Sequence, residues 1–275
     1  MIFYGCGKQR VFKSNMDGII TLLTDFGTKD SYVGTMKGVI LSINPNATIV
    51  DISHQIPPQD IMAGAFVLSQ AAPFFPRNTI HIAVVDPGVG GNRKPILVQT
   101  DRCFFVGPDN GIFSIALQNE KIKQKIHLTN KDYFLSRISH TFHGRDIFSP
   151  VGAYLSKGFD PSAFGKRIKT ITKLNFKKPH AKNRKITGQI IYTDRFGNLI
   201  TNIDEDLIKK VFKSKRFEIM IGSYTIKKLV PSYAYAKKNE IVSLIDSSGF
   251  LEIAARDKNA GIELGVKRGD IIILQ

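Results

Sequence analysis

Residues 79–95 read TIHIAVVDPGVGGNRKP, an apolar and largely β-branched run that ends at Asp86 and breaks into a glycine-rich turn. A short apolar run bounded by turn residues is typical of a buried strand. In an open α/β sheet, ligands bind beyond the carboxyl ends of the strands. The stretch therefore predicts a buried strand that brings Asp86 to a ligand-binding edge, with Arg93 following in the turn. A tight turn without chemistry fits the same residues, because aspartate is a common turn residue.

The turn does not resemble a phosphate-binding loop. It has neither the GxxxxGK[ST] spacing nor a GxGxxG that leads into a helix, and the residues after Arg93 indicate another strand. The carboxylate at the head of the loop would also repel a phosphate. A structural turn and part of a catalytic site are the two interpretations that remain.

Strands and helices alternate around this stretch. Strands are expected at 18–25, 48–52, 79–85, 95–100 and 103–107, and helices at 31–43, 59–71 and 111–117. This alternation predicts an α/β domain with a parallel-rich central sheet. From about residue 185 the pattern changes to short strands separated by turns, with one helix near 204–212. That pattern predicts a smaller antiparallel β domain, either a barrel or a sandwich.

These patterns give the expected domain boundaries. We expect an N-terminal extension at 1–17, a catalytic α/β domain at 18–175, a basic linker at 176–185 and the β domain at 186–275.

The net charge of +16 is unevenly distributed, and the block 166–185 holds nine basic residues and no acidic one. Such a block could bind the phosphates of a nucleic acid. Its one aromatic residue, Phe176, and the absence of a known docking motif favour a solvated linker. We therefore expect no nucleic-acid partner.

Composition also limits the compartment. An apolar fraction of 43% is typical of a folded globular chain, and no apolar run approaches the roughly 18 residues of a membrane-spanning helix. The N-terminal residues lack the apolar segment of a secretory signal. Cys6 and Cys103, the two cysteines of the sequence, form no disulfide framework and favour a reducing compartment. We expect a cytoplasmic protein with no membrane partner.

Several polar residues stand where an α/β sheet would place a site. Asp25, like Asp86, ends an expected strand, and His143 and Asp146 flank a glycine in FHGRDIF. Because two carboxylates stand at equivalent strand ends, a shared functional site is favoured over the interpretation that each belongs to an unrelated turn. A metal held by these four residues is conceivable, but no HxxxH or ExxH spacing supports it. His143 could instead act as a general base or orient a water.

In the second domain, the stretch TDRFGNLITNI (193–203) indicates a strand, a turn and another strand. The turn from Asp194 to Gly197 fits a β-turn with no further role. Asn198 could also offer both a donor and an acceptor to the edge of a purine. The residues leave both interpretations open.

Six stretches together resemble one family. They are TDFGTKDSYVG, VVDPGVGGNR, FVGPDNGIF, FHGRDIF, TDRFGNLITNI and SSGFLEIA. In this order they resemble the S-adenosyl-L-methionine hydroxide adenosyltransferases, relatives of fluorinating and chlorinating enzymes. The resemblance covers residues 18–275. It implies hydrolysis of S-adenosyl-L-methionine to adenosine and methionine by a water that the triad Asp86, Arg93 and His143 activates, with His143 and Asp86 accepting hydrogen bonds from that water. It implies no metal and no organic cofactor.

The resemblance also implies roles in substrate binding. Asp25 is expected to hold the ribose hydroxyls, Asn198 to contact the adenine edge and Tyr235 to stack on the ring. The residues expected to receive the methionine amine and carboxylate are Asp30, Asp194 and Ser247. The halogenating relatives carry an arginine where this chain has Ser248, a departure that bears on recognition of the methionine carboxylate.

The resemblance further implies a homotrimer with the site at the subunit interface. Two other functions compete with hydrolysis. A halogenating adenosyltransferase would use chloride or fluoride, which an anionic Asp86 opposes. A non-catalytic nucleoside-binding or nucleic-acid-binding protein would use the basic second half and show no turnover.

Overall fold

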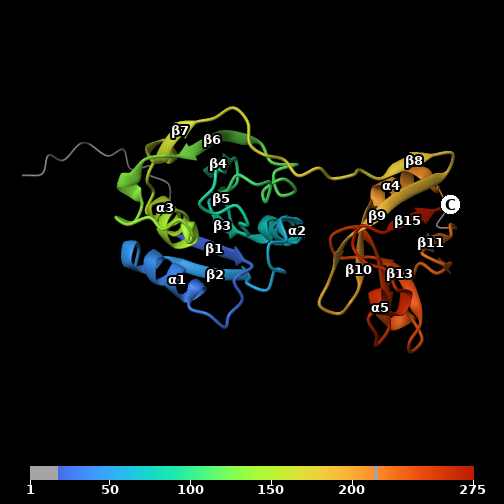
Figure 1. The fold of residues 1–275 in the computed structure, drawn as a ribbon. Coiled ribbons are helices and arrows are strands. Elements are labelled where there is room, and N and C mark those ends of the chain that lie inside the picture. Colours follow the sequence, from blue (N-terminus) through green and yellow to red (C-terminus); the bar gives the residue numbers. More distant parts are fainter. Residues whose placement is uncertain (1–17, 214–215) are drawn as a thin grey trace, which may run out of the picture. The chain divides into compact units, whose positions relative to one another are not determined.

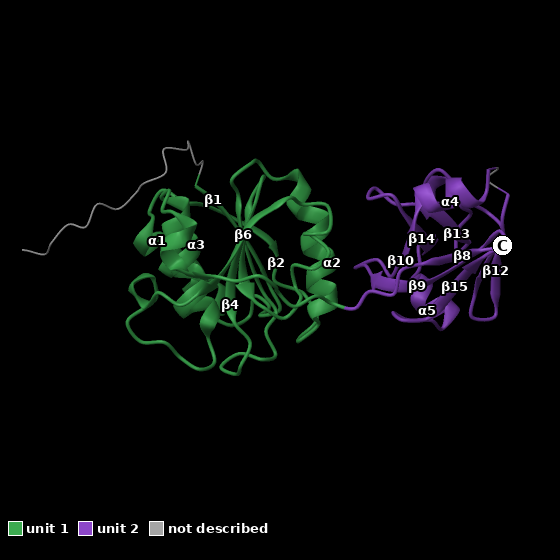
Figure 2. Cartoon of the chain, turned by 90° about the horizontal axis from the view of Figure 1, so that it is seen from above, with its two compact units in different colours: residues 1–174 green, residues 175–275 purple. Residues whose placement is uncertain are grey.

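The computed structural model describes residues 18–213 and 216–275, which form two compact units, shown in Figure 2. The first unit ends at Leu174 and the second begins at Asn175. The extension expected at 1–17, including Cys6, lies outside the described residues. No helix of the described residues is long and apolar enough to cross a membrane.

The first unit is built on a seven-stranded sheet in the order β2-β1-β3-β5-β4-β6-β7. The strands are β1 (Ile19–Thr24), β2 (Thr48–Ser53), β3 (Ile80–Val84), β4 (Pro95–Thr100), β5 (Phe104–Pro108), β6 (Ile122–Leu128) and β7 (Gly165–Arg167). Strands β2, β1, β3 and β5 are parallel, whereas β4, β6 and β7 pair antiparallel. The expected α/β domain is confirmed. Its sheet is mixed because the segment that joins β4 to β5 is too short for the crossover that two parallel strands require, so these strands pair antiparallel.

Helices cover both faces of this sheet, as Figure 2 shows. The helices are α1 (Tyr32–Ile43), α2 (Ile61–Ala71) and α3 (Ser149–Ser156). α1 and α3 lie on one face and α2 on the other. The core under α1 and α3 includes Ile20, Leu22, Met36, Ile82 and Val151, all fully buried or nearly so.

The structure differs from the expected elements at two places in the first unit. Residues 111–117 form successive turns rather than a helix, with Gly111 at a φ of 98°. α3 was not expected, and it follows a single π-helical turn, Gly144–Phe148.

The chain order places a topological switch point between β1 and β3. From β1 the chain passes through α1 to β2 on one side, and then through α2 to β3 on the other side of β1 (Figure 1). Thr24 is in register with Val84, so Asp25 and Asp86 leave the sheet at the same edge. In this class of fold, the crevice at such a point is where ligands bind.

The second unit is an antiparallel β domain, as expected. The strands are β8 (His180–Lys182), β9 (Lys185–Thr193), β10 (Leu199–Asp204), β11 (Ile219–Ile221), β12 (Tyr224–Ile226), β13 (Ile241–Ile245), β14 (Phe250–Ala255) and β15 (Ile271–Leu274). They form one sheet in the order β12-β11-β15-β9-β10-β14-β13, and β8 also pairs with β9. β8 lies within the stretch expected to be a linker. The helices α4 (Glu205–Val211) and α5 (Ala260–Leu264) pack on the same core as the strands.

His81 of β3 is a histidine within the core of the first unit. Its ring lies between those of Phe75 and Phe105, at centroid distances of 5.6 and 5.2 Å, and its Nδ1 forms a 2.8 Å hydrogen bond with Thr21 Oγ1. Burial, and then the charge of Arg102, lower the pKa of His81 to about 4. In the unfolded chain the pKa is about 6.5, so on acidification the unfolded state takes up a proton that the folded state does not.

We expect this histidine to make the first unit sensitive to acid. Its contribution is complete above about pH 6.5 and is lost as pH falls towards 4, by up to about 3 kcal/mol. Urea unfolding across this range should show the wild type losing more stability than His81→Gln. Parallel pH dependences of the two proteins would contradict the expectation.

Candidate active site

Asp86, Arg93 and His143 meet at the edge of the sheet beyond β3. Arg93 Nε donates to both Asp86 oxygens, at 3.0 and 2.9 Å, and Arg93 Nη2 donates to Asp86 Oδ2. The same Nη2 donates to His143 Nδ1 at 2.7 Å. The side chains of Asp86 and Arg93 are only 4% and 9% exposed. Arg93 is thus a bridge that holds a carboxylate and an imidazole in one cluster.

The arginine fixes the tautomer of His143. A guanidinium only donates hydrogen bonds, so Nδ1 must accept, and the neutral ring then carries its proton on Nε2. Burial, and then the charge of Arg93, lower the pKa of His143 below its usual value. The imidazole is therefore neutral at neutral pH and presents an Nε2–H donor. This differs from the acceptor role expected from the sequence, because Arg93 already occupies the lone pair of Nδ1.

One donor of the cluster is left over. Arg93 Nη1 is buried and has no hydrogen-bond partner within residues 18–213 and 216–275. A buried donor without a partner is costly, and such groups are typical of sites that receive a ligand atom. Nη1 could receive the oxygen of a nucleophile or a substrate.

The strand end that carries Asp86 is held by a side chain from another loop. Asn110 Nδ2 donates to the carbonyl oxygen of Val85 at 2.7 Å, and Asn110 Oδ1 accepts from the backbone N–H of Ile112 at 3.2 Å. Asn110 belongs to FVGPDNGIF, and no role was expected for it from the sequence. It fixes the backbone immediately before Asp86.

His143 is held by the π-helical turn that begins after it. The fully buried Asp146 accepts hydrogen bonds from Arg145 Nε at 2.6 Å and from the backbone N–H of Ser139 at 2.7 Å. Ser149 Oγ donates to the carbonyl oxygen of Gly144 at 2.8 Å. These contacts close the loop 139–146 on itself and so fix the position from which His143 reaches Arg93.

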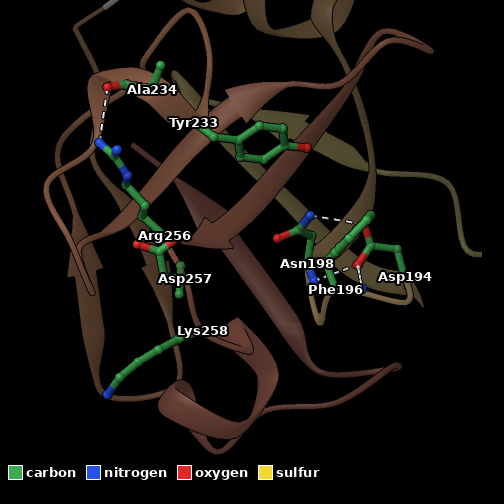
Figure 3. A pocket seen from close by; sticks show the side chains of 9 residues that line it. Asp194, Phe196, Asn198, Tyr233, Ala234, Arg256, Asp257 and Lys258 are labelled. Carbon is green, nitrogen blue, oxygen red and sulfur yellow. Dashed lines mark hydrogen bonds between the residues drawn. The ribbon is translucent and has the colours of Figure 1, made fainter.

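The second unit contains a pocket of about 670 Å³, shown in Figure 3. Its lining residues are Asp194, Phe196, Asn198, Tyr233, Ala234, Ala255, Arg256, Asp257 and Lys258. Asn198 Nδ2 donates to Asp194 Oδ2 at 2.9 Å, which leaves its amide oxygen directed elsewhere. Arg256 Nη1 donates to the carbonyl oxygens of Ala234 and Ala236 and holds the segment that carries Tyr233. An amide, two aromatic rings and two carboxylates around a cavity of this size suit a ligand with a flat polar ring.

Family models match both units. The N-terminal domain of SAM hydroxide adenosyltransferase matches residues 20–165, and its C-terminal domain matches residues 188–273. The chain belongs to the SAM hydroxide adenosyltransferase family. This confirms the resemblance derived from the six sequence stretches.

Proteins of known name are also similar to this member of the adenosyltransferase family over most of its length. (R)-S-adenosyl-L-methionine hydrolase from Methanocaldococcus jannaschii is 40% identical over 260 residues, which cover 90% of this chain and 92% of that protein. A fluorinase from Actinoplanes sp. is more distant, at 24% identity over 93% of this chain and 97% of its own length. The crystal structure of an uncharacterized conserved protein from Thermotoga maritima has a TM-score of 0.88 and 36% identity, covering 93% of this chain and 99% of that chain.

The other site residues expected in the first unit of this adenosyltransferase, Asp25 and Asp30, form no hydrogen bond with Asp86, Arg93 or His143 among the described residues. Asp25 Oδ2 accepts from the backbone N–H of Gln59 at 2.8 Å, and Asp30 is exposed. Within the described part of the chain, no group of three histidine, cysteine, aspartate or glutamate side chains is placed to hold a metal ion. Asp86 and Asp146 instead pair with Arg93 and Arg145.

In the second unit, Asp194 and Asn198 line the pocket, but Tyr235 and Ser247 are not among its lining residues. Tyr235 is 65% exposed, whereas Tyr233 lines the pocket. Both belong to a 3₁₀ turn, Tyr233–Tyr235, in which residues two apart point in different directions. The expectation from the sequence named Tyr235 alone, because the turn geometry that places Tyr233 at the pocket is not visible in the stretch SYAY.

The glycine turn after Asp86 packs directly on the loop that carries His143. A Cβ at Gly90 would overlap the carbonyl oxygen of His140, and the φ of Gly90 is 76°. Only glycine combines this backbone conformation with so close an approach.

We expect Gly90→Ala to push the loop that carries His143 away from the turn that carries Asp86 and Arg93. The unfolding free energy should fall by about 1–3 kcal/mol, and turnover should fall with it. Gly27→Ala is the matched control, since Gly27 has a φ of 67° but a Cβ there would meet no atom of the described residues within 4 Å. Equal losses of stability in both variants would show that the contact with His140 has no effect.

Proposed function

We propose that this protein hydrolyses S-adenosyl-L-methionine to adenosine and L-methionine. The observation that carries the proposal is the bridge that Arg93 makes between Asp86 and His143 at the switch point of the sheet. Membership of the adenosyltransferase family and the relatives named as hydrolases support it.

The reaction needs a nucleophile more than it needs an acid. Water attacks C5′ of the ribose in line with the sulfur, a C–O bond forms, and the C–S electron pair leaves with methionine as a neutral thioether. The water must lose a proton, and Asp86 is the acceptor in the cluster. His143 Nε2–H and the unpartnered Arg93 Nη1 can donate to the water oxygen and stabilise the charge that develops on it as hydroxide.

The pocket of the second unit fits the adenosine portion of this substrate. Asn198 can contact the edge of the base, and Phe196 or Tyr233 can lie against its face. Asp25 is the candidate for the ribose hydroxyls, and Asp194 for the methionine amine. Asp30 and Ser247 remain candidates for contacts with the methionine amine and carboxylate, and an aspartate suits the amine because an ionised carboxylate only accepts hydrogen bonds.

We further propose that the reaction requires no metal and no organic cofactor, because a sulfonium departs without help from a Lewis acid. We also propose a homotrimer, as the family resemblance implies, in which neighbouring subunits complete each site. The low cysteine content supports a cytoplasmic location.

Chromatography of the purified protein after incubation with S-adenosyl-L-methionine tests the proposal. Adenosine and methionine should appear in equal amounts, with unchanged rates in the presence of a chelator. Parallel incubations with chloride or fluoride test halogenation, which would yield a 5′-halogenated adenosine. Loss of activity with a chelator, restored by one divalent ion, would contradict the metal-free mechanism. Absence of any product would contradict the proposed hydrolysis.

A further inference from the structure

Glu252 of β14 is a buried acid that bonds to one residue of the pocket in the second unit, and it takes no part in the hydrogen bonds around Asp86. Glu252 is 4% exposed, and its cross-strand neighbours, Ile200 and Leu244, are apolar. The hydroxyl of Tyr233 donates to Glu252 Oε1 at 2.7 Å. Tyr233 thus has its ring in the pocket wall and its hydroxyl bound to a buried carboxyl.

The surroundings of Glu252 are not those of a structural ion pair. Within the described residues, the hydroxyl of Tyr233 is the one group that donates a hydrogen bond to this carboxyl. The ionisable groups that act on it from the neighbouring turns, Asp194 and Asp246, are both acidic. Burial raises the pKa of Glu252 to about 7, the hydrogen bond from Tyr233 opposes this, and the two aspartates add to it. Burial and the bond to Glu252 raise the pKa of Tyr233, so its hydroxyl keeps the proton that it donates.

Resting on the proposed function, we infer that Glu252 is a positioning residue that, when ionised, holds Tyr233 against the nucleoside in the pocket. An ionised carboxylate accepts a hydrogen bond about twice as strong as a neutral one. Tyr233 is 45% exposed, so the rest of its surroundings constrain it weakly. The charge on Glu252 therefore determines how firmly this part of the pocket wall is held.

The same carboxyl opposes folding, which separates this role from a structural one. A raised pKa means that the folded state keeps a proton that the unfolded state releases. Glu252 therefore lowers stability progressively as pH rises from about 4.5 through about 7. A residue retained for stability would not have this sign. We expect Glu252→Gln to melt at a higher temperature than the wild type above neutral pH.

Binding of adenosine, measured by calorimetry from about pH 6 to about pH 8, tests the inference, because adenosine has no group that titrates in this range. The wild type should bind about fivefold more tightly at the upper end, the difference expected between charged and neutral acceptors. Glu252→Gln keeps an acceptor for the tyrosine, and its affinity should not change with pH. Tyr233→Phe should bind more weakly and also without pH dependence. Tyr224→Phe is the matched control, since its hydroxyl bonds the backbone of Glu263 away from the pocket, and it should behave as wild type.

The outcomes distinguish this inference from the proposed function. If the wild type binds adenosine and Glu252→Gln shows the same pH dependence, the inference is wrong and hydrolysis is unaffected. If the wild type neither binds adenosine nor consumes S-adenosyl-L-methionine, both are wrong. Lower thermal stability of Glu252→Gln at about pH 8 would instead indicate a structural role for the acid.

Discussion

Asp86→Asn is expected to lower kcat by about 10²-fold or more, the scale associated with loss of a general base. The substitution keeps the size of the side chain but removes the charge that accepts the proton of water. An amide also replaces one of the two acceptor oxygens facing Arg93 by a donor, so one hydrogen bond of the bridge is lost. KM should change much less, because the interaction develops in the transition state.

Asp25→Asn is the matched control for this experiment. It makes the same change at the end of the neighbouring strand β1, and there it should raise KM more than it lowers kcat. Thermal unfolding of both variants establishes that they are folded. If Asp86→Asn keeps a kcat near that of the wild type, the stretch 84–95 is a tight turn without a catalytic role.

The alternating strands and helices of the first unit could be read from the sequence because their signals are local. The apolar run before Asp86 is β3, and the one before Asp25 is β1. Parallel pairing of these strands then brings the two carboxylates to one edge. A short sequence motif thus contains most of the information needed to locate this end of the site.

Other elements depend on contacts far away in the sequence. Pro150 and Gly152 read as helix breakers, yet both lie in α3. The proline occupies the first turn, where its missing N–H has no effect. A Cβ at Gly152 would come within 2.6 Å of Ile82, so the glycine is there to let the helix approach β3. No local pattern contains that information.

The site shows the same limit. The tautomer of His143 depends on Arg93, 50 residues away, and the pKa of Glu252 depends on its burial and on Tyr233, 19 residues away. In the sequence, Glu252 is simply one acid in the strand stretch FLEIAA. Its burial and its acidic neighbours become visible only when the turns around it are placed.

Replacement of Arg93 is expected to have the largest effect on the cluster. Arg93→Lys keeps the charge, but an ammonium cannot hold both oxygens of Asp86 and also donate to His143 in the geometry of a guanidinium. We expect kcat to fall by at least about 10²-fold. Arg93→Ala should in addition lower the unfolding free energy by about 3 kcal/mol, because it leaves the buried carboxylate of Asp86 without a partner.

Arg145→Lys provides the matched control, since Arg145 pairs with a buried carboxylate in the same way but is 34% exposed and, among the described residues, donates to no histidine. It should lower kcat by less than about tenfold, equivalent to about 1.4 kcal/mol of barrier. The double variant Arg93→Lys, His143→Ala should be little worse than Arg93→Lys alone, because residues that act as a unit give non-additive losses. Additive losses would mean that the imidazole acts without the arginine, and that the 2.7 Å contact between them has no part in activating water.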